Sequence, residues 1–258
     1  MSEQTIVPAV FKSRYAPVAG IWDAEEAKIY GRYQVTIKMA DTIRGGIPQN
    51  PEIIESWLRQ RIAGGDEELR IAMLRTLDEL GHDVADGMTM DQLKEVAKEM
   101  ATKNNANTFF SDDLGLWIRA SNVKAMLKEN VSILYPYTKK ENRMGPTAKA
   151  AKAFWAERVF VDGDRVYLMR DGQHITEPDG TELQIGHVPS AQGRKSTLTY
   201  YDYCEQPELT FTIFSLEDMV QMDMWRSVFL GAQRNGLGAT RSLGHGTFKV
   251  IAFDKEPS

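Results

Sequence analysis

Hydrophobic and polar residues alternate strictly near the start of the chain. Residues 33–39, YQVTIKM, place an apolar side chain at every second position, which predicts a half-buried strand. Paired glycines and a proline at 45–48 then end regular structure. Similar patterns predict further extended segments at 108–110, 114–119, 197–203, 208–214 and 247–253.

Turn-forming residues interrupt this alternation at several places. Residues 111–113, Ser-Asp-Asp, stand between two extended segments and predict a hairpin. Alternating apolar residues on both sides of Asp162-Gly163-Asp164 predict a second hairpin over 158–169. Residues 170–196 are rich in Gly, Pro, Asp and Gln and indicate a long excursion from the sheet.

Apolar residues spaced three and four apart predict helices elsewhere. Residues 49–107 contain three such patterns, the first capped by Asn50 and the last opened by a capping box at 89–92. Ser121 or Asn122 is expected to cap a helix that continues to about residue 134. A further helix is expected from Ser215 to about residue 234.

This order of elements predicts an α+β fold. We expect a ferredoxin- or RRM-like, mainly antiparallel sheet with helices on one face, plus a helical insertion. The core domain would comprise residues 1–48 and 108–258, and residues 49–107 would form the insertion.

Charge is distributed unevenly over these segments. The 258 residues carry a net charge of −5, and residues 49–107 alone hold 12 acids and 7 bases. Residues 119–152 hold eight bases against two acids, and residues 224–253 hold four bases and no acid. Such local positive fields bind phosphates even on an acidic protein, although the same residues could be solvated helix faces.

Composition excludes several classes of protein. Hydrophobic residues make up 42% of the chain, the globular average, and no apolar run is long enough to cross a membrane. The N-terminal residues lack the layout of a signal peptide, so we expect a cytoplasmic protein. The lone Cys204 and four widely spaced histidines give no disulfide and no metal site, and no cofactor is expected.

A glycine-rich loop at 236–246, GLGATRSLGHG, is the most informative segment. Its four glycines permit positive φ angles, and backbone amides beside Arg241 could hold a phosphate. The alternative is a tight connection packed against a helix. His245, among these glycines, is a weak candidate for an acid or base acting on a phosphodiester.

Aromatic and basic residues also interleave between 135 and 155. Aromatic rings and cations together bind single-stranded nucleic acid, but periodicity alone does not separate such rings from core residues. The aromatic residues are Tyr135, Tyr137, Phe154 and Trp155, and the bases are Lys139, Lys140, Arg143, Lys149 and Lys152.

Three segments together resemble the RAMP superfamily. Residues 116–128, LWIRASNVKAMLK, resemble the strand–turn–helix motif of CRISPR effector-backbone subunits. Residues 33–46 are similar to the first strand of that family and its Gly-Gly turn, and residues 236–248 resemble its C-terminal glycine-rich loop, which precedes the last strand. Arg119 and Ala125 depart from the motif, replacing a proline and a glycine.

The resemblance implies that the chain holds the sugar–phosphate backbone of a single-stranded guide RNA. Subunits that cut target RNA carry an aspartate shortly after the Gly-Gly turn, and residues 47–49, Ile-Pro-Gln, do not match it. Cleavage by that route is therefore not expected. The RNA-binding residues expected from the resemblance and from charge are Ser121, Asn122, Lys124, Lys128, Lys139, Lys140, Arg143, Gly236, Gly238, Arg241, Gly244 and Gly246.

Two other functions remain open at this stage. The first is a metal-independent endoribonuclease that processes guide RNA and uses His245 or another histidine. The second is an assembly protein of a virus or mobile element that keeps the fold without RNA. Expected partners are single-stranded RNA and either copies of the chain or other protein subunits, with no membrane contact.

Overall fold

The structure of this protein is a computed structural model that describes residues 29–48, 54–55, 58–59, 65–80, 82–101, 106–138, 140, 143–190, 193–216 and 220–256. Within these residues the chain forms five α-helices and three sheets with mostly antiparallel pairing, so it is an α+β protein. None of the helices described is long and apolar enough to cross a membrane.

The central sheet has a ferredoxin-like strand order. Its strands run in the order β14–β1–β13–β7, and every neighbouring pair is antiparallel. The connection from β1 to β7 is long and ends in two helices that pack on the sheet, and one α-helix connects β13 with β14, so the order of these elements matches the β-α-β-β-α-β arrangement of ferredoxin-like folds. The predicted fold class is confirmed. The bounds are β1 (Tyr30–Met39), β7 (Val159–Val161), β13 (Glu208–Leu216) and β14 (Phe248–Lys255), with β9 (Met169–Arg170) and β10 (Gln173–His174) at the edge beyond β13.

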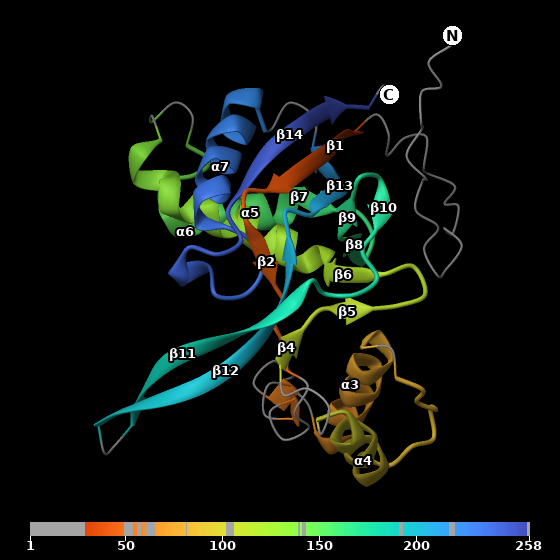
Figure 1. Cartoon of the computed structure of the whole chain (residues 1–258). Helices are drawn as coiled ribbons and strands as arrows, with labels where there is room; N and C mark the ends of the chain where they lie inside the picture. The colour runs from red at the N-terminus through yellow and green to blue at the C-terminus, as the bar shows by residue number, and fades with distance from the viewer. Residues whose placement is uncertain are drawn as a thin grey trace.

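Three helices cover one face of this sheet, as Figure 1 shows: α5 (Ala120–Leu134), α6 (Ala148–Arg158) and α7 (Met222–Asn235). Because side chains alternate along a strand, Val35 and Ile37 of β1 point into the helices and are fully buried. Arg32 and Lys38 point the other way and are exposed. The main core forms between the helices and the inward residues of β1 and β13.

A long two-stranded ribbon extends from the body of the protein (Figure 1). It consists of β11 (Gly180–Ser190) and β12 (Gly193–Glu205), paired antiparallel along their whole length. The predicted excursion over 170–196 therefore contains one complete strand of this ribbon and the start of the other. The base of β12 also pairs with β2 (Thr42–Arg44) and, in parallel, with β4 (Ala106–Thr108), which pairs with β3 (Ile47–Pro48).

The third sheet is the smallest of the three. It contains β5 (Phe110–Ser111), β6 (Leu116–Arg119) and β8 (Arg165–Tyr167). The hairpin predicted around 111–113 is confirmed, since β5 pairs with β6. The hairpin predicted over 158–169 is wrong: β7 pairs with β13, whereas β8 pairs with β6. Alternation along 158–169 identified two strands with buried faces, but those faces belong to different sheets.

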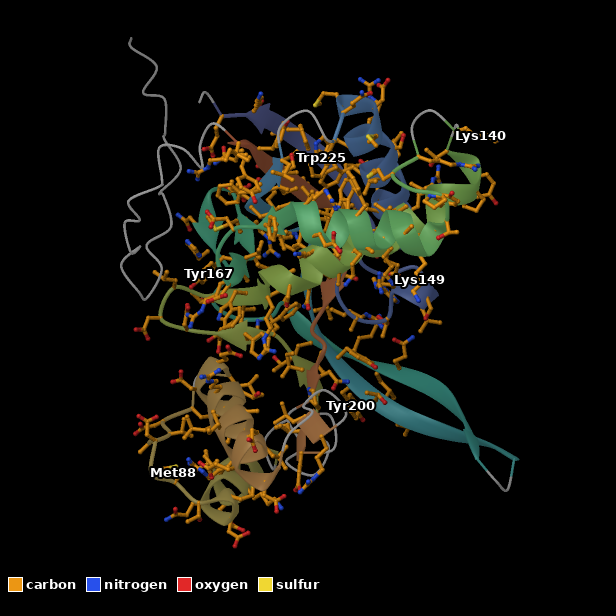
Figure 2. The ribbon with its side chains drawn as sticks, turned by 180° about the vertical axis from the view of Figure 1, so that it is seen from behind. Met88, Lys140, Lys149, Tyr167, Tyr200 and Trp225 are labelled. Atoms are coloured by element: carbon orange, nitrogen blue, oxygen red, sulfur yellow. The ribbon has the colours of Figure 1, made fainter. Side chains whose placement is uncertain are left out.

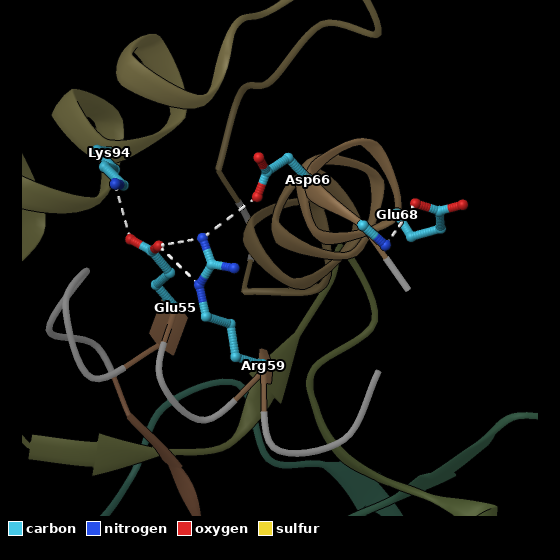
Figure 3. A network of polar contacts seen from close by, with 6 residues as sticks. Glu55, Arg59, Asp66, Glu68 and Lys94 are labelled. Atoms are coloured by element: carbon cyan, nitrogen blue, oxygen red, sulfur yellow. Dashed lines mark hydrogen bonds and ion pairs between the residues drawn. The ribbon is translucent and has the colours of Figure 1, made fainter. Parts of the chain in front are cut away.

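A helical block packs below this third sheet. It includes α3 (Asp66–Glu79) and α4 (Met90–Ala101), and the predicted capping box between Thr89 and Gln92 is present. Glu55 accepts from Lys94 of α4 and from Arg59, which also approaches Asp66 (Figure 3). The predicted cap at Asn50 lies outside the described residues.

The last helix begins later than the sequence pattern predicts. Ser215 lies in β13 and is 1% exposed, and α7 starts after Gln221. Buried and partly buried residues alternate along β13 as far as residue 216, so the strand extends past the expected helix start. Among the elements described there are also two short 3-10 helices, η1 (Tyr135–Tyr137) and η3 (Arg241–Leu243).

Candidate nucleic-acid interface

A hollow of about 280 Å³ lies where β6 passes directly into α5. The residues predicted to bind RNA that line it are Ser121 and Lys124. Arg119 contributes from the end of β6, Glu79 from the end of α3, and Asp164 from the turn that follows β7. Side chains from four separate segments therefore enclose the start of one helix.

The first turn of α5 has no side-chain cap. Arg119 occupies the N-cap position, and its side chain accepts no hydrogen bond from the helix. The predicted cap at Ser121 or Asn122 is wrong, because the helix begins at Ala120 and both residues lie exposed in the first turn. The amide of Ala120 donates to the carbonyl oxygen of Asp164 at 2.9 Å. A helix start of this kind carries a partial positive charge and favours an anion.

Two cations line the hollow, and they differ in their partners. Arg119 forms an ion pair with Glu79 at 2.5 Å and lies over the ring of Phe110. The ammonium of Lys124 lies 4.5 Å from the centre of the Phe160 ring. Burial lowers the pKa of Lys124, and repulsion from Lys128 lowers it further. Among the described carboxylates, none lies within ion-pair distance of Lys124, so this ammonium can accept an anionic ligand without first releasing one.

The glycine-rich loop contacts the same helix farther along. Arg241 forms an ion pair with Glu129 of α5 at 2.8 Å, and both side chains are more than a third exposed. Ser121 and Glu129 are eight residues apart, about 12 Å along the helix axis. Lys128, half-buried, stands between these two points. α5 therefore brings Ser121, Asn122, Lys124, Lys128 and the loop residue Arg241 together.

All four glycines of the loop have positive φ, as predicted: Gly236, Gly238, Gly244 and Gly246 lie between 75° and 93°. A side chain on Gly246 would meet the carbonyl oxygen of Leu237 at 1.9 Å, and one on Gly238 would meet Ile43 at 2.8 Å. The loop needs glycine both for its backbone conformation and for its close packing.

Several amides of this loop donate within the protein. Ala239 donates to Arg44, Gly246 donates to Thr42, and Leu237 donates to Gly246, at 2.8 to 3.1 Å. These three amides fasten the loop to itself and to β2, and they are occupied in the structure. Arg241 provides the charged side chain of the loop. His245 is half-buried between two glycines.

Lys140 and Arg143 follow the C-terminal end of α5, which is about 22 Å long for its 15 residues. Lys140 is exposed beyond that end (Figure 2), and Lys139 lies outside the described residues. Arg143 donates to the carbonyl oxygen of Thr138 at 2.9 Å and covers the ring of Tyr135, so it holds a turn. The predicted set thus divides into two groups at opposite ends of one helix.

The interleaved aromatic residues have different environments. Trp155 is fully buried and packs edge-on against Trp225, which makes it a core residue. Phe154 is half-buried under the guanidinium of Arg158. Tyr137 is 84% exposed. The core interpretation holds for Trp155, whereas Tyr137 is free to contact another molecule.

Sequence reasoning missed Arg44, a buried charge next to the glycine-rich loop. Its side chain is 1% exposed, forms an ion pair with Glu182 and donates to Gln184, both on the ribbon. Its carbonyl oxygen accepts from the loop residue Ala239. An arginine after an apolar strand residue gives no sign of this role, because its partners stand about 140 residues later in the chain.

Metal-ligating groups are not clustered in the part of the chain that the structure describes. Burial lowers the pKa of His82. The side chains that line the hollow include the cations of Arg119 and Lys124, the hydroxyl of Ser121 and the carboxylates of Glu79 and Asp164.

No family model matches this chain, and no curated protein matches it. Among solved structures, the chain is similar to a chain of the "Cryo-EM structure of the Type III-B Cmr-beta bound to cognate target RNA". The two are 12% identical with a TM-score of 0.41, and the match covers 90% of this chain and 63% of the other. This chain therefore spans less than two thirds of the length of its structural neighbour. The ferredoxin-like assignment rests on the strand order described above.

Proposed function

We propose that this chain is a RAMP-like subunit that binds the sugar–phosphate backbone of single-stranded RNA. The observation that carries the proposal is the hollow at the start of α5, where a helix without a side-chain cap meets the Ser121 hydroxyl and the Lys124 ammonium. Backbone amides, hydroxyls and cations are the groups that proteins use to hold phosphates. None of them selects a base, so the expected binding tolerates different sequences.

The course of α5 supports a path for more than one phosphate. From the hollow, Lys128 follows along the helix, and then Arg241, whose partner Glu129 lies about 12 Å along the helix axis from Ser121. Arg241 is paired with Glu129 in an exposed position, where an ion pair contributes little. A phosphate can therefore replace Glu129 at small cost.

Negative charge limits where RNA can bind. Glu79 and Asp164 border the hollow, and the net charge of the whole chain is −5. RNA is therefore expected to contact a short row of cations rather than a broad basic surface. Affinity from few contacts falls with salt along a shallow slope, about 0.7 in log units per phosphate for single strands.

The ribbon supports the further proposal that the chain works in a multi-subunit or self-stacking assembly. Leu183 stands opposite Tyr200, and Ile185 opposite Leu198, so the four side chains share one face. Their exposed fractions lie between 44% and 64%. An exposed apolar patch on a projecting element is typical of a contact with another protein.

Purification at low salt, followed by a binding titration with single-stranded RNA at several salt concentrations, tests the RNA-binding proposal. We expect co-purifying RNA and an affinity that decreases as salt rises. Lys124→Ala should weaken binding about tenfold and reduce the salt slope by about one phosphate contact. Lys249→Ala, an exposed lysine on β14, is the matched control and should bind like the unaltered protein. A protein that binds no RNA even at low salt would refute the proposal.

A further inference from the structure

We propose that Phe160 stacks a nucleobase of the RNA whose phosphate occupies the hollow at the start of α5. This inference rests on the proposed backbone binding and adds a base-binding position to it. Nothing in the sequence pattern marks Phe160 except that it is an outward residue of a short strand.

Phe160 lies at an open edge of the central sheet. Its strand, β7, pairs only with β13 among the described strands. The neighbouring Val159 is fully buried against the helices, whereas the Phe160 ring points to the opposite face and is 38% exposed. Tyr30 meets the ring edge-on at 6.1 Å, and Phe214 stands directly opposite in the sheet. The ring is therefore held in place by its neighbours while one part stays accessible.

Lys124 joins this ring to the hollow. Its side chain lines the hollow, and its ammonium lies 4.5 Å from the centre of the Phe160 ring. Val161, the residue directly after Phe160, lines the hollow, as do Gly163 and Asp164 of the adjoining turn and Lys124 itself. A nucleotide whose phosphate entered the hollow would thus bring its base close to Phe160.

The ammonium of Lys124 and a base compete for the same face of the ring. In the protein without RNA the positive charge is attracted to the negative face of the ring. A phosphate in the hollow attracts the ammonium more strongly, because its charge is a full negative charge. Movement of the Lys124 ammonium toward the phosphate exposes the face of the Phe160 ring, so that a base can stack on it once the phosphate is bound.

The surroundings of Phe160 favour a base over a protein partner. Arg32 forms ion pairs with Asp162 at 4.0 Å and with Glu256 at 3.1 Å, and its guanidinium lies over the ring of Phe214, which stands opposite Phe160. Phe160 is the exposed ring of a small aromatic group whose other members, Tyr30 and Phe214, are partly buried, whereas a stable protein interface buries roughly 800 Å² on each partner. One aromatic ring is the size of one base, and stacking of this kind is tolerant of sequence.

Two oligomers of equal length separate base stacking from backbone binding. One is oligoadenylate, and the other is an abasic ribose-phosphate oligomer that offers phosphates without bases. Phe160→Ala should weaken oligoadenylate binding about 5- to 100-fold, the effect of losing one stacked base. The same variant should bind the abasic oligomer like the unaltered protein. Phe160→Tyr keeps a ring and should restore oligoadenylate binding.

Tyr137→Ala provides the matched control, because Tyr137 is 84% exposed but lies beyond the far end of α5. It should change neither affinity. Lys124→Ala should weaken the binding of both oligomers. For oligoadenylate, the loss of affinity in the double variant Lys124→Ala, Phe160→Ala should be smaller than the product of the two single losses, since Lys124 contacts both the phosphate position and the base position.

The inference is overturned if Phe160→Ala binds oligoadenylate as tightly as the unaltered protein does. It is overturned too if its affinity for the abasic oligomer falls by the same factor as its affinity for oligoadenylate. It is also overturned if Tyr137→Ala, and not Phe160→Ala, removes the base contribution. If the chain does not bind RNA at all, the unaltered protein will bind neither oligomer at low salt. That outcome would refute both the RNA-binding proposal and the role of Phe160. Circular dichroism verifies that each variant is folded.

Discussion

Gly244 and Gly246 stand two residues apart in the glycine-rich loop with similar positive φ angles, 92° and 75°. Their surroundings differ. A side chain on Gly244 would meet nothing within 4 Å, whereas one on Gly246 would meet the carbonyl oxygen of Leu237 at 1.9 Å. Backbone conformation is therefore the only reason for glycine at the first position, and packing is a second reason at the other.

Alanine at these two positions should separate the two effects. Gly244→Ala is expected to lower the free energy of unfolding by about 1–2 kcal/mol, the cost of a left-handed residue with a side chain. Gly246→Ala should lower it by about 4 kcal/mol or more, because the 237–246 contact must open. Urea denaturation measures both. An equal decrease in the free energy of unfolding in the two variants would show that the backbone at Leu237 shifts away from the new side chain at no measurable cost.

The β5–β6 hairpin is held at its turn by Asp112. The carboxylate accepts from the hydroxyl of Tyr167, from the guanidinium of Arg165 and from the amides of Leu114 and Gly115. Burial alone would raise the pKa of Asp112, but these hydrogen bonds together hold it below the usual 3.8. Burial, with the contact to Asp112, raises the pKa of Tyr167 to about 12.

These shifts predict a specific dependence of stability on pH. The native pKa of Asp112 lies below its unfolded value, so its stabilisation is complete above about pH 5 and disappears as the pH falls through the native pKa. Asp112→Asn should cost about 1.5–3 kcal/mol at pH 7, since bonds to a charge are lost. The difference from the unaltered protein should shrink in acid. Unfolding at pH 7 and pH 2.5 measures it, with Asp113→Asn, at the exposed next position, as control. A difference independent of pH would contradict the assignment to the ionised carboxylate.

The positions of strands and helices were easier to predict than the strands with which they pair. Alternation predicted the strand over 33–39, and apolar residues spaced three and four apart predicted the helix after residue 120, because each pattern depends on which side chains face a core. It did not show that β7 and β8 belong to different sheets, since alternation marks a buried face and not the strand beside it. The predicted site behaves likewise: Ser121 and Lys124 were found together because they share a helix. Phe160 was missed because only the fold brings it beside Lys124, 36 residues earlier in the chain.

At the scale of the whole molecule, one sheet separates two hydrophobic cores. Alternate residues of β6 face opposite sides: Leu116 and Ile118 belong to the core under the central sheet, and Trp117 belongs to the core of the helical block. The same holds for β8, where Val166 and Tyr167 face different cores. The predicted domain boundaries at 49 and 107 stay a prediction, but the shared sheet makes it difficult for either core to unfold alone.

A cavity in the helical block should therefore weaken the central sheet as well. Leu77 of α3 is fully buried in the core that contains Trp117, and Leu77→Ala is expected to cost about 2–5 kcal/mol. Hydrogen exchange reports this locally. If the cores unfold together, the amides of Val35 and Ile37 in β1 lose the same free energy of protection as those of α3. Val35→Ala, the reciprocal change in the other core, should lower protection in α3 to the same extent as in β1. Protection in β1 that is unchanged by Leu77→Ala would mean that the helical block opens independently, and that the three-stranded sheet stays with the central core when it does.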